Sequence, residues 1–144
     1  MAGLLFLDTS VLVAAERNRL RVDDIAQPDP EAGLAMSVIT VAEMLQGLHR
    51  ARTDQQRSSR ERFIAEMLER IELFQVDLPV AQEHARIWAD LSERGEMIGP
   101  YDLIIAATAI ARRAPLATLN EREFRKVKGL DVRPVHQIRG PRKS

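Results

Sequence analysis

Three carboxylate residues stand beside strongly apolar segments of the chain. Asp8 directly follows the run "LLFL", Glu43 lies five residues past the run "LAMSV", and Asp102 opens the run "DLIIAATAI". A carboxylate that enters such surroundings has to be paired with a cation or bound to a metal. Carboxylates that converge on one spot also raise the pKa of one another. A shared divalent cation resolves that conflict, so the three residues are candidates for a metal site.

The donor types favour Mg²⁺ or Mn²⁺ at such a site. Oxygen ligands without thiolates suit these hard cations, and the chain has no cysteine. Zinc is disfavoured because His49, His84 and His136 show no metal-ligand spacing; we expect them to be surface or partly buried histidines. The sequence also has no Gly-x-Ser-x-Gly elbow, no Walker loop and no Gly-x-Gly-x-x-Gly motif.

Asp102 is the most informative of the three acids. Residues 103–111 are apolar apart from one threonine, so the helix that they form is expected to be covered on most sides. The nearest cations along the sequence are poorly placed to pair with Asp102. Arg112 lies at the far end of the helix, and Arg94 lies beyond a loop flanked by glycines.

Each acid also has a purely structural explanation. Asp8 can cap the helix that follows it by accepting a backbone N–H. Glu43 follows Thr40 by three residues, and "TVAE" matches a capping box. Asp102 lies in a first helical turn, where the helix dipole favours a negative charge by roughly 0.3–1 kcal/mol. Taken singly, these residues leave both interpretations open.

Short apolar runs alternate with stretches of helical period, which is typical of parallel strands joined by crossover helices. Trp88 and the apolar residues of the helices, Met44 and Met67 among them, are expected in the core. Strands are predicted at 4–8, 34–38, 71–77, 115–119 and 131–135, and helices at 10–17, 40–50, 54–70, 79–91 and 98–113, with a small helix between the last two strands and a polar connection over 18–33. The pattern predicts an α/β fold: a three-layer α/β/α sandwich with a central parallel sheet of four to five strands. Ligands of such folds bind outside the carboxyl ends of the strands, where the acids lie.

Length and charge set the remaining limits. A chain of 144 residues that is 45% hydrophobic is the size of one domain, which we assign to 1–137, with a basic C-terminal tail at 138–144. The formal net charge is zero, but 125–144 carry seven basic residues and one acid. No apolar run approaches the ~18 residues of a membrane span. We therefore expect a cytoplasmic protein without membrane contact.

Four segments together resemble a known family. "LLFLDTSVLV", "SVITVAEMLQGL", "GEMIGPYDLIIAATAI" and "LATLNEREF" are similar, in order and over essentially the whole chain, to the four acidic blocks of PIN-domain ribonucleases, specifically the VapC-type toxins of type II toxin–antitoxin systems. The third block carries the most specific match, with glycine, isoleucine, aspartate and alanine at the positions that the family pattern requires.

The resemblance implies a PIN-like sheet with Mg²⁺ or Mn²⁺ held by Asp8, Glu43 and Asp102. It implies a fourth catalytic acid at Glu123, where the family pattern has an aspartate. The segment from Asn120 to Glu123 is also compatible with a capping box of its own helix. The supporting residues that we assign are Thr118 and Asn120, to orient a metal-bound water, and Thr9 or Ser10, to donate a hydrogen bond to Asp8.

The implied activity is endonucleolytic hydrolysis of RNA by a metal-activated water. The implied partners are an RNA substrate, a cognate antitoxin whose C-terminal segment enters the acidic site, and a second copy in a homodimer, for which the apolar face of 54–71 is a candidate. Arg17, Arg19, Arg50 and the basic tail are candidates for RNA contacts, although solvated charge explains each of them equally well.

Two other functions remain open. A DNA-directed or flap-type metal nuclease could use the same acidic core. A non-catalytic, receiver-like regulatory module could share the fold, but Asp8 has no acidic neighbour and no lysine precedes Lys126.

Overall fold

The computed structural model describes residues 3–25 and 31–135. Within these ranges the elements are β1 (Leu4–Leu7), α1 (Thr9–Glu16), α2 (Val22–Ile25), β2 (Gly33–Ser37), α3 (Val38–His49), α4 (Asp54–Arg70), β3 (Glu72–Phe74), α5 (Leu78–Arg94), α6 (Pro100–Ala111), β4 (Leu116–Thr118), α7 (Glu121–Phe124) and β5 (Val132–Pro134). His136 and the predicted tail at 138–144 lie outside the described residues. The domain limits therefore stay a prediction.

The five strands form one parallel sheet in the order β3-β2-β1-β4-β5. The chain builds outward from β1 through β2 to β3, then returns to the other side of β1 for β4 and β5. The strand order therefore changes direction between β1 and β4, and the carboxyl ends of strands at such a switch point are where open α/β sheets bind ligands. The predicted fold class and strand number are confirmed.

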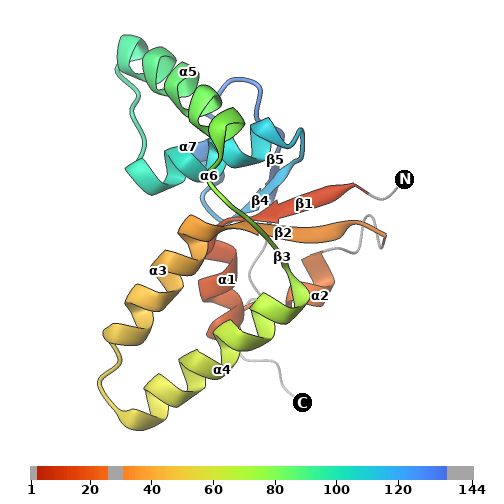
Figure 1. Ribbon diagram of the computed structural model, residues 1–144, viewed down its shortest axis with the longest axis vertical. Helices are drawn as coiled ribbons and strands as arrows, with labels where there is room; N and C mark the ends of the chain where they lie inside the picture. Colours follow the sequence, from red (N-terminus) through yellow and green to blue (C-terminus); the bar gives the residue numbers. More distant parts are fainter. Residues whose placement is uncertain (1–2, 26–30, 136–144) are drawn as a thin grey trace.

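Helices cover both faces of the sheet, with α5, α6 and α7 on one side and α1, α2, α3 and α4 on the other (Figure 1). Successive strand residues point to opposite faces, and both faces of the central strand are buried. Phe6 of β1 packs with Leu116 and the helices α5 and α6, whereas Leu7 packs with Ala117 and the helices α1, α3 and α4. This explains why the strands are apolar without interruption.

The helix that carries Asp102 lies almost wholly in this core. Six consecutive or near-consecutive residues of α6 are buried: Leu103, Ile105, Ala106, Ala107, Thr108 and Ala109. Gly95 ends α5 in the left-handed conformation, with φ of 66°, and Pro100 begins α6. The turn between these two closely packed helices thus has the glycine and proline that its conformation favours.

Trp88 corrects one expectation. It was predicted in the core, but its side chain is 54% exposed. The buried stripe of α5 is Val80, Ile87 and Leu91, and the residue that follows Ile87 is turned about 100° away from that stripe. The predicted core positions Met44 and Met67 are buried.

Most predicted boundaries differ from the structure by one to three residues, and the largest differences concern two segments. The third strand is confined to β3, shorter than the predicted 71–77, and the polar connection over 18–33 contains the single helical turn α2. Every helix within residues 3–25 and 31–135 is too short or too polar to span a lipid bilayer.

Candidate active site

Asp8 occupies the junction between the first strand and its helix. The register pairs Leu7 of β1 with Ala117 of β4, so Asp8 and Thr118 come next to each other at the carboxyl ends of adjacent strands. The Thr118 hydroxyl donates to Asp8 Oδ2 at 2.6 Å, and the Ser10 hydroxyl donates to Asp8 Oδ1 at 2.6 Å. The carboxylate also caps α1 by accepting from the Val11 N–H at 3.2 Å. Capping and a role in the site are therefore compatible.

Burial dominates the electrostatics of Asp8. The residue is only 1% exposed, and this desolvation raises its pKa, although hydrogen bonds from Ser10, Thr118 and Val11 oppose the shift. The Ser10 oxygen also accepts from the Leu119 N–H at 3.2 Å. The start of α1 and the end of β4 are thus tied together around one carboxylate.

Glu43 projects from α3 and is held by a hydroxyl of α1. The Thr9 hydroxyl donates to Glu43 Oε1 at 2.6 Å, and the Thr9 and Thr40 hydroxyl oxygens are 3.2 Å apart. Of the two hydroxyls expected to support Asp8, Ser10 does so, whereas Thr9 supports Glu43. Thr40 is a contact that sequence reasoning missed as a site residue; its position one turn before Glu43 on the same helix face was the available signal.

The capping-box alternative for Glu43 is wrong. The helix α3 begins before Thr40, and its N-cap is Ser37, whose hydroxyl accepts from the Ile39 N–H at 3.1 Å. Thr40 is fully buried inside the helix, so Glu43 has no capping function there.

Asp102 lies half-buried in the first turn of α6, after the N-cap Gly99. Within residues 3–25 and 31–135, no cation pairs with its carboxylate and no hydrogen bond reaches it. The arginines that precede and follow its helix are engaged elsewhere, Arg94 with Asp90 and Arg112 with Asp77.

The surroundings of Asp102 disfavour its charge. Burial, followed by the negative charges of Asp8, Glu43 and Glu123, raises the pKa of Asp102 to about 6. Four carboxylates from four separate segments of the chain therefore interact at one edge of the sheet. This is the like-charge conflict that a bound cation relieves.

Glu123, unlike Asp102, has a cationic partner. Its carboxylate accepts from Lys126 Nζ at 3.1 Å. The Asn120 side chain makes no capping hydrogen bond, and its backbone N–H donates instead to the Thr118 hydroxyl at 2.8 Å. The capping box considered for this segment is therefore absent, and Thr118 is occupied with Asp8 and Asn120.

The donors fit a hard divalent cation in kind and in charge. The charged donors of the cluster are carboxylate oxygens. Burial raises the pKa of Asp102, and the negative charges of the other three acids raise it further. Among the described residues, however, no three His, Cys, Asp or Glu side chains stand ready-made around one metal position. Hydroxyls of Thr9, Ser10 and Thr118 hold two of the carboxylates. The fit is therefore one of donor type rather than of finished coordination geometry.

A model of the PIN domain family matches residues 5–130. The chain belongs to the PIN-domain family. Ribonuclease VapC1 of Rickettsia felis is 30% identical over 131 residues, which are 91% of this chain and 96% of that protein. Ribonuclease VapC5 of Mycobacterium tuberculosis is 35% identical over 119 residues, covering 80% of this chain and 82% of its own. The PIN domain described above is therefore of the VapC type, as its four acidic blocks predicted.

A solved structure agrees with this PIN assignment. VapBC-5 from Mycobacterium tuberculosis, described as a member of the VapBC family of toxin–antitoxin systems, superimposes with a TM-score of 0.74 at 28% identity. The match covers 92% of this chain and 98% of that chain. Sequence and fold thus point to the same branch of the PIN family.

Proposed function

We propose that this chain is a metal-dependent endoribonuclease that hydrolyses RNA phosphodiester bonds, and that it is the toxin of a toxin–antitoxin pair. The observation that carries the proposal is the cluster of four interacting carboxylates, in which the pKa of Asp102 is raised to about 6 with no cation beside it in the described part of the chain. The names of the relatives, Ribonuclease VapC1 and Ribonuclease VapC5, support the choice of RNA as substrate.

The catalytic acids that we propose are Asp8, Glu43, Asp102 and Glu123. The first three would hold Mg²⁺ or Mn²⁺, and Glu123, paired with Lys126, would add negative charge at the rim. A divalent cation bound there acidifies water and offsets charge on the phosphate.

The other residues of the site position these acids. Ser10 and Thr118 fix both oxygens of the Asp8 carboxylate, and Thr9 fixes one oxygen of Glu43. The buried residues of α6 fix the position of Asp102 near the carboxyl ends of the strands. Because side chains held in this way lose little further freedom on binding, the site is partly preorganised.

Binding partners follow from the same proposal. The site repels RNA unless its negative charge is offset, so RNA binding requires the cation together with nearby arginines. We propose a cognate antitoxin as protein partner, supported by the toxin–antitoxin description of the VapBC-5 structure, and a cytoplasmic location, where RNA and antitoxin are found together.

We also propose a homodimer, although α4 is a poorer interface than its sequence suggested. Ile64 and Met67 of that helix are buried in the core, and Leu68 is 44% exposed. Light scattering on the purified chain is expected to give twice its 16.2 kDa mass.

One assay tests the activity. The purified protein is incubated with single-stranded RNA, and separately with single-stranded, duplex and flap DNA, in the presence of Mg²⁺, Mn²⁺ or EDTA. We expect RNA cleavage with either metal and none in EDTA. Preferential cleavage of DNA would instead support a DNA-directed or flap-type nuclease. Absence of cleavage on every substrate would favour a non-catalytic, receiver-like module.

A further inference from the structure

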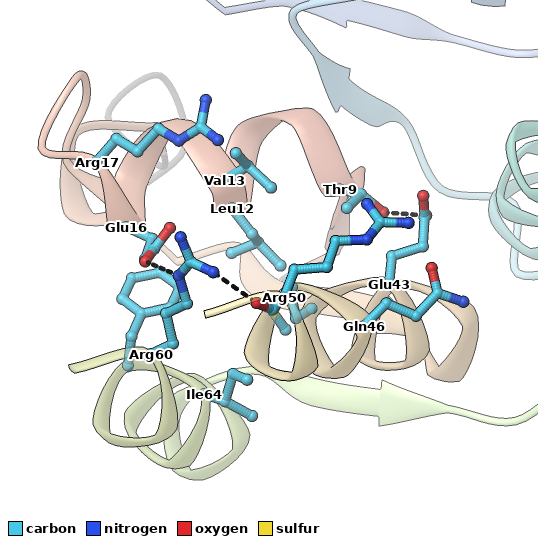
Figure 2. Close-up of a pocket in the computed structure, with 13 residues that line it drawn as sticks. Thr9, Leu12, Val13, Glu16, Arg17, Glu43, Gln46, Arg50, Arg60 and Ile64 are labelled. Atoms are coloured by element: carbon cyan, nitrogen blue, oxygen red, sulfur yellow. Dashed lines mark hydrogen bonds and ion pairs between the residues drawn. The ribbon is translucent and has the colours of Figure 1, made fainter. Parts of the chain in front are cut away.

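A pocket adjoins the acidic cluster on the side of α1, α3 and α4 (Figure 2). It has a volume of about 360 Å³, and Thr9 and Glu43 form part of its wall. The floor is apolar, with Leu12, Met44 and Ile64 among its residues. Because Thr9 and Glu43 belong to both the pocket wall and the candidate active site, the pocket lies directly beside that site.

Three arginines line the same pocket, and they differ in how they are paired. Arg60 is used structurally, because it forms an ion pair with Glu16 at 3.6 Å and donates to the Gly47 carbonyl at 2.5 Å. Arg17 and Arg50 have no hydrogen-bond or ion-pair partner for their side chains within the part of the chain that the structure describes. Two full positive charges are therefore available to a ligand.

Helix geometry sets these charges at a fixed spacing from the acids. Glu43 and Arg50 are seven residues apart on α3, which is two turns on one helix face and roughly 10 Å of rise. Thr9 and Arg17 lie a similar two turns apart on α1. In Figure 2, Arg50 extends from the end of α3 towards Thr9 and Glu43, and Arg17 lies at the far end of α1. Arg50 thus brings one guanidinium group to the Thr9–Glu43 end of the pocket, and Arg17 brings a second to the other end.

A helix-end role alone does not account for this arrangement. Arg17 and Arg50 are the C-cap residues of α1 and α3, where the helix dipole stabilises a positive charge. That benefit requires only the charge and does not require both guanidinium groups to line one pocket beside the acids. Arginine presents a planar fork that suits phosphate oxygens.

We propose that Arg50 and Arg17 form a subsite for the two successive RNA phosphates next to the one held at the carboxylates, with one phosphate at each guanidinium group. This inference rests on the proposed ribonuclease function and adds where the substrate strand runs: along the pocket between α1 and α3, away from the acidic cluster. The apolar floor would contact the sugar or base of the nucleotide between the two phosphates. The positive charge of this subsite attracts the RNA backbone, which the carboxylates repel.

Binding can be measured separately from cleavage. We would determine the affinity of a short fluorescent single-stranded RNA for the full chain by anisotropy, over a range of salt concentrations. The background is Asp102→Asn, which blocks cleavage and removes one of the charges that repel RNA, with Mg²⁺ in excess to load the weakened metal site. The test variants are Arg17→Gln, Arg50→Gln and the double variant. Arg62→Gln is the matched control, because Arg62 is exposed on α4 and lines no part of this pocket.

Each phosphate contact contributes about 0.7 to the slope of log affinity against log salt for a single strand. We expect the double variant to lose about 1.4 of that slope and at least about tenfold in affinity, each single variant about half of the slope change, and Arg62→Gln neither. The single variants provide the result if the double variant does not fold. In the chain with native Asp102, the same substitutions should raise KM with little change in kcat.

The outcomes separate the two proposals. If native protein cleaves RNA but Arg17→Gln and Arg50→Gln behave like Arg62→Gln, the subsite is wrong and the nuclease proposal stands. If the variants lose RNA affinity while no chain cleaves, the subsite stands and the proposed activity is wrong. Loss of binding to a partner protein with unchanged RNA affinity and salt slope would assign the pocket to that protein and overturn the inference.

Discussion

Replacing Asp102 with asparagine should abolish cleavage and, at the same time, stabilise the metal-free protein. Asparagine keeps the shape of the side chain and removes its charge. The ordinary pKa of 3.8 is raised to about 6 in the fold by burial and by the other acids. A tenfold change in a proton-binding constant corresponds to about 1.4 kcal/mol, which sets an upper limit of about 3 kcal/mol on the cost of ionised Asp102 near neutral pH. Solvent screening of this half-buried carboxylate lowers the cost below that limit.

The sign of the pH dependence follows from linkage. Because the folded state raises the pKa of Asp102, it binds this proton more tightly than the unfolded state does. The contribution of this proton to the free energy of unfolding is fully present below pH 3.8 and is lost as the pH rises to about 6. Asp102→Asn should therefore gain the most above pH 6 and almost nothing near pH 4.

Urea unfolding in EDTA at about pH 4 and about pH 8 measures the stability gain of Asp102→Asn and its dependence on pH. At the higher pH, we expect the asparagine variant to be more stable and its Tm to rise by several degrees. Glu66→Gln is the control, since Glu66 is exposed on α4 away from the cluster. The reasoning fails if Asp102→Asn is no more stable than the native chain at about pH 8, or if its gain does not shrink on acidification. Adding Mg²⁺ should reverse the order, because only the native site binds it tightly.

Three further results are expected. Thr118→Val removes a hydrogen bond to the buried Asp8 carboxylate and should cost about 1–3 kcal/mol in urea unfolding, whereas Thr118→Ser, which keeps the hydroxyl, should cost clearly less. Thr9→Val should leave the fold intact and weaken Mg²⁺ affinity, measured by calorimetry, by about 10–100-fold; an unchanged affinity would contradict its positioning role. Partial desolvation acts on Asp77, but the Val80 N–H and Arg112 lower its pKa below the ordinary value. The stability that this carboxylate contributes is therefore lost as the pH falls through its lowered pKa. In Asp77→Asn, the free energy of unfolding from urea titrations should therefore fall less steeply as the pH is lowered.

The positions of the acids were predictable because they depend on the strands. Continuous apolar runs marked β1, β2 and β4, and parallel strands bring their carboxyl ends to one edge of a sheet. The residues at those ends, Asp8 and Thr118, were therefore expected at one edge of the sheet, and the pairing of β4 with β1 brings them into direct contact. Asp102 was predictable for a different reason, since a lone charge before an apolar helix requires a compensating partner.

The hydroxyl contacts could not be predicted in detail. Thr9 and Ser10 are neighbours in sequence, and only their rotation about α1 decides that one faces Glu43 and the other faces Asp8. Likewise, Ser37 and Thr40 both match a helix cap, and the end of β2 selects the first of them. Trp88 was misplaced because apolar residues lie near it on the same helix, whereas the register of α5 against the sheet decided its exposure.

The hydrogen bond between Thr118 and Asp8 joins residues that are 110 positions apart. The strand that carries Thr118 inserts between β1 and β5, so the carboxylate of Asp8 acquires its full set of partners only after β4 has docked. During synthesis, β1, β2 and most of the helices leave the ribosome before that strand exists. The carboxylate site is thus incomplete until residue 118 has been made and β4 has docked. For the ribonuclease proposed above, cleavage therefore cannot begin before that point in synthesis.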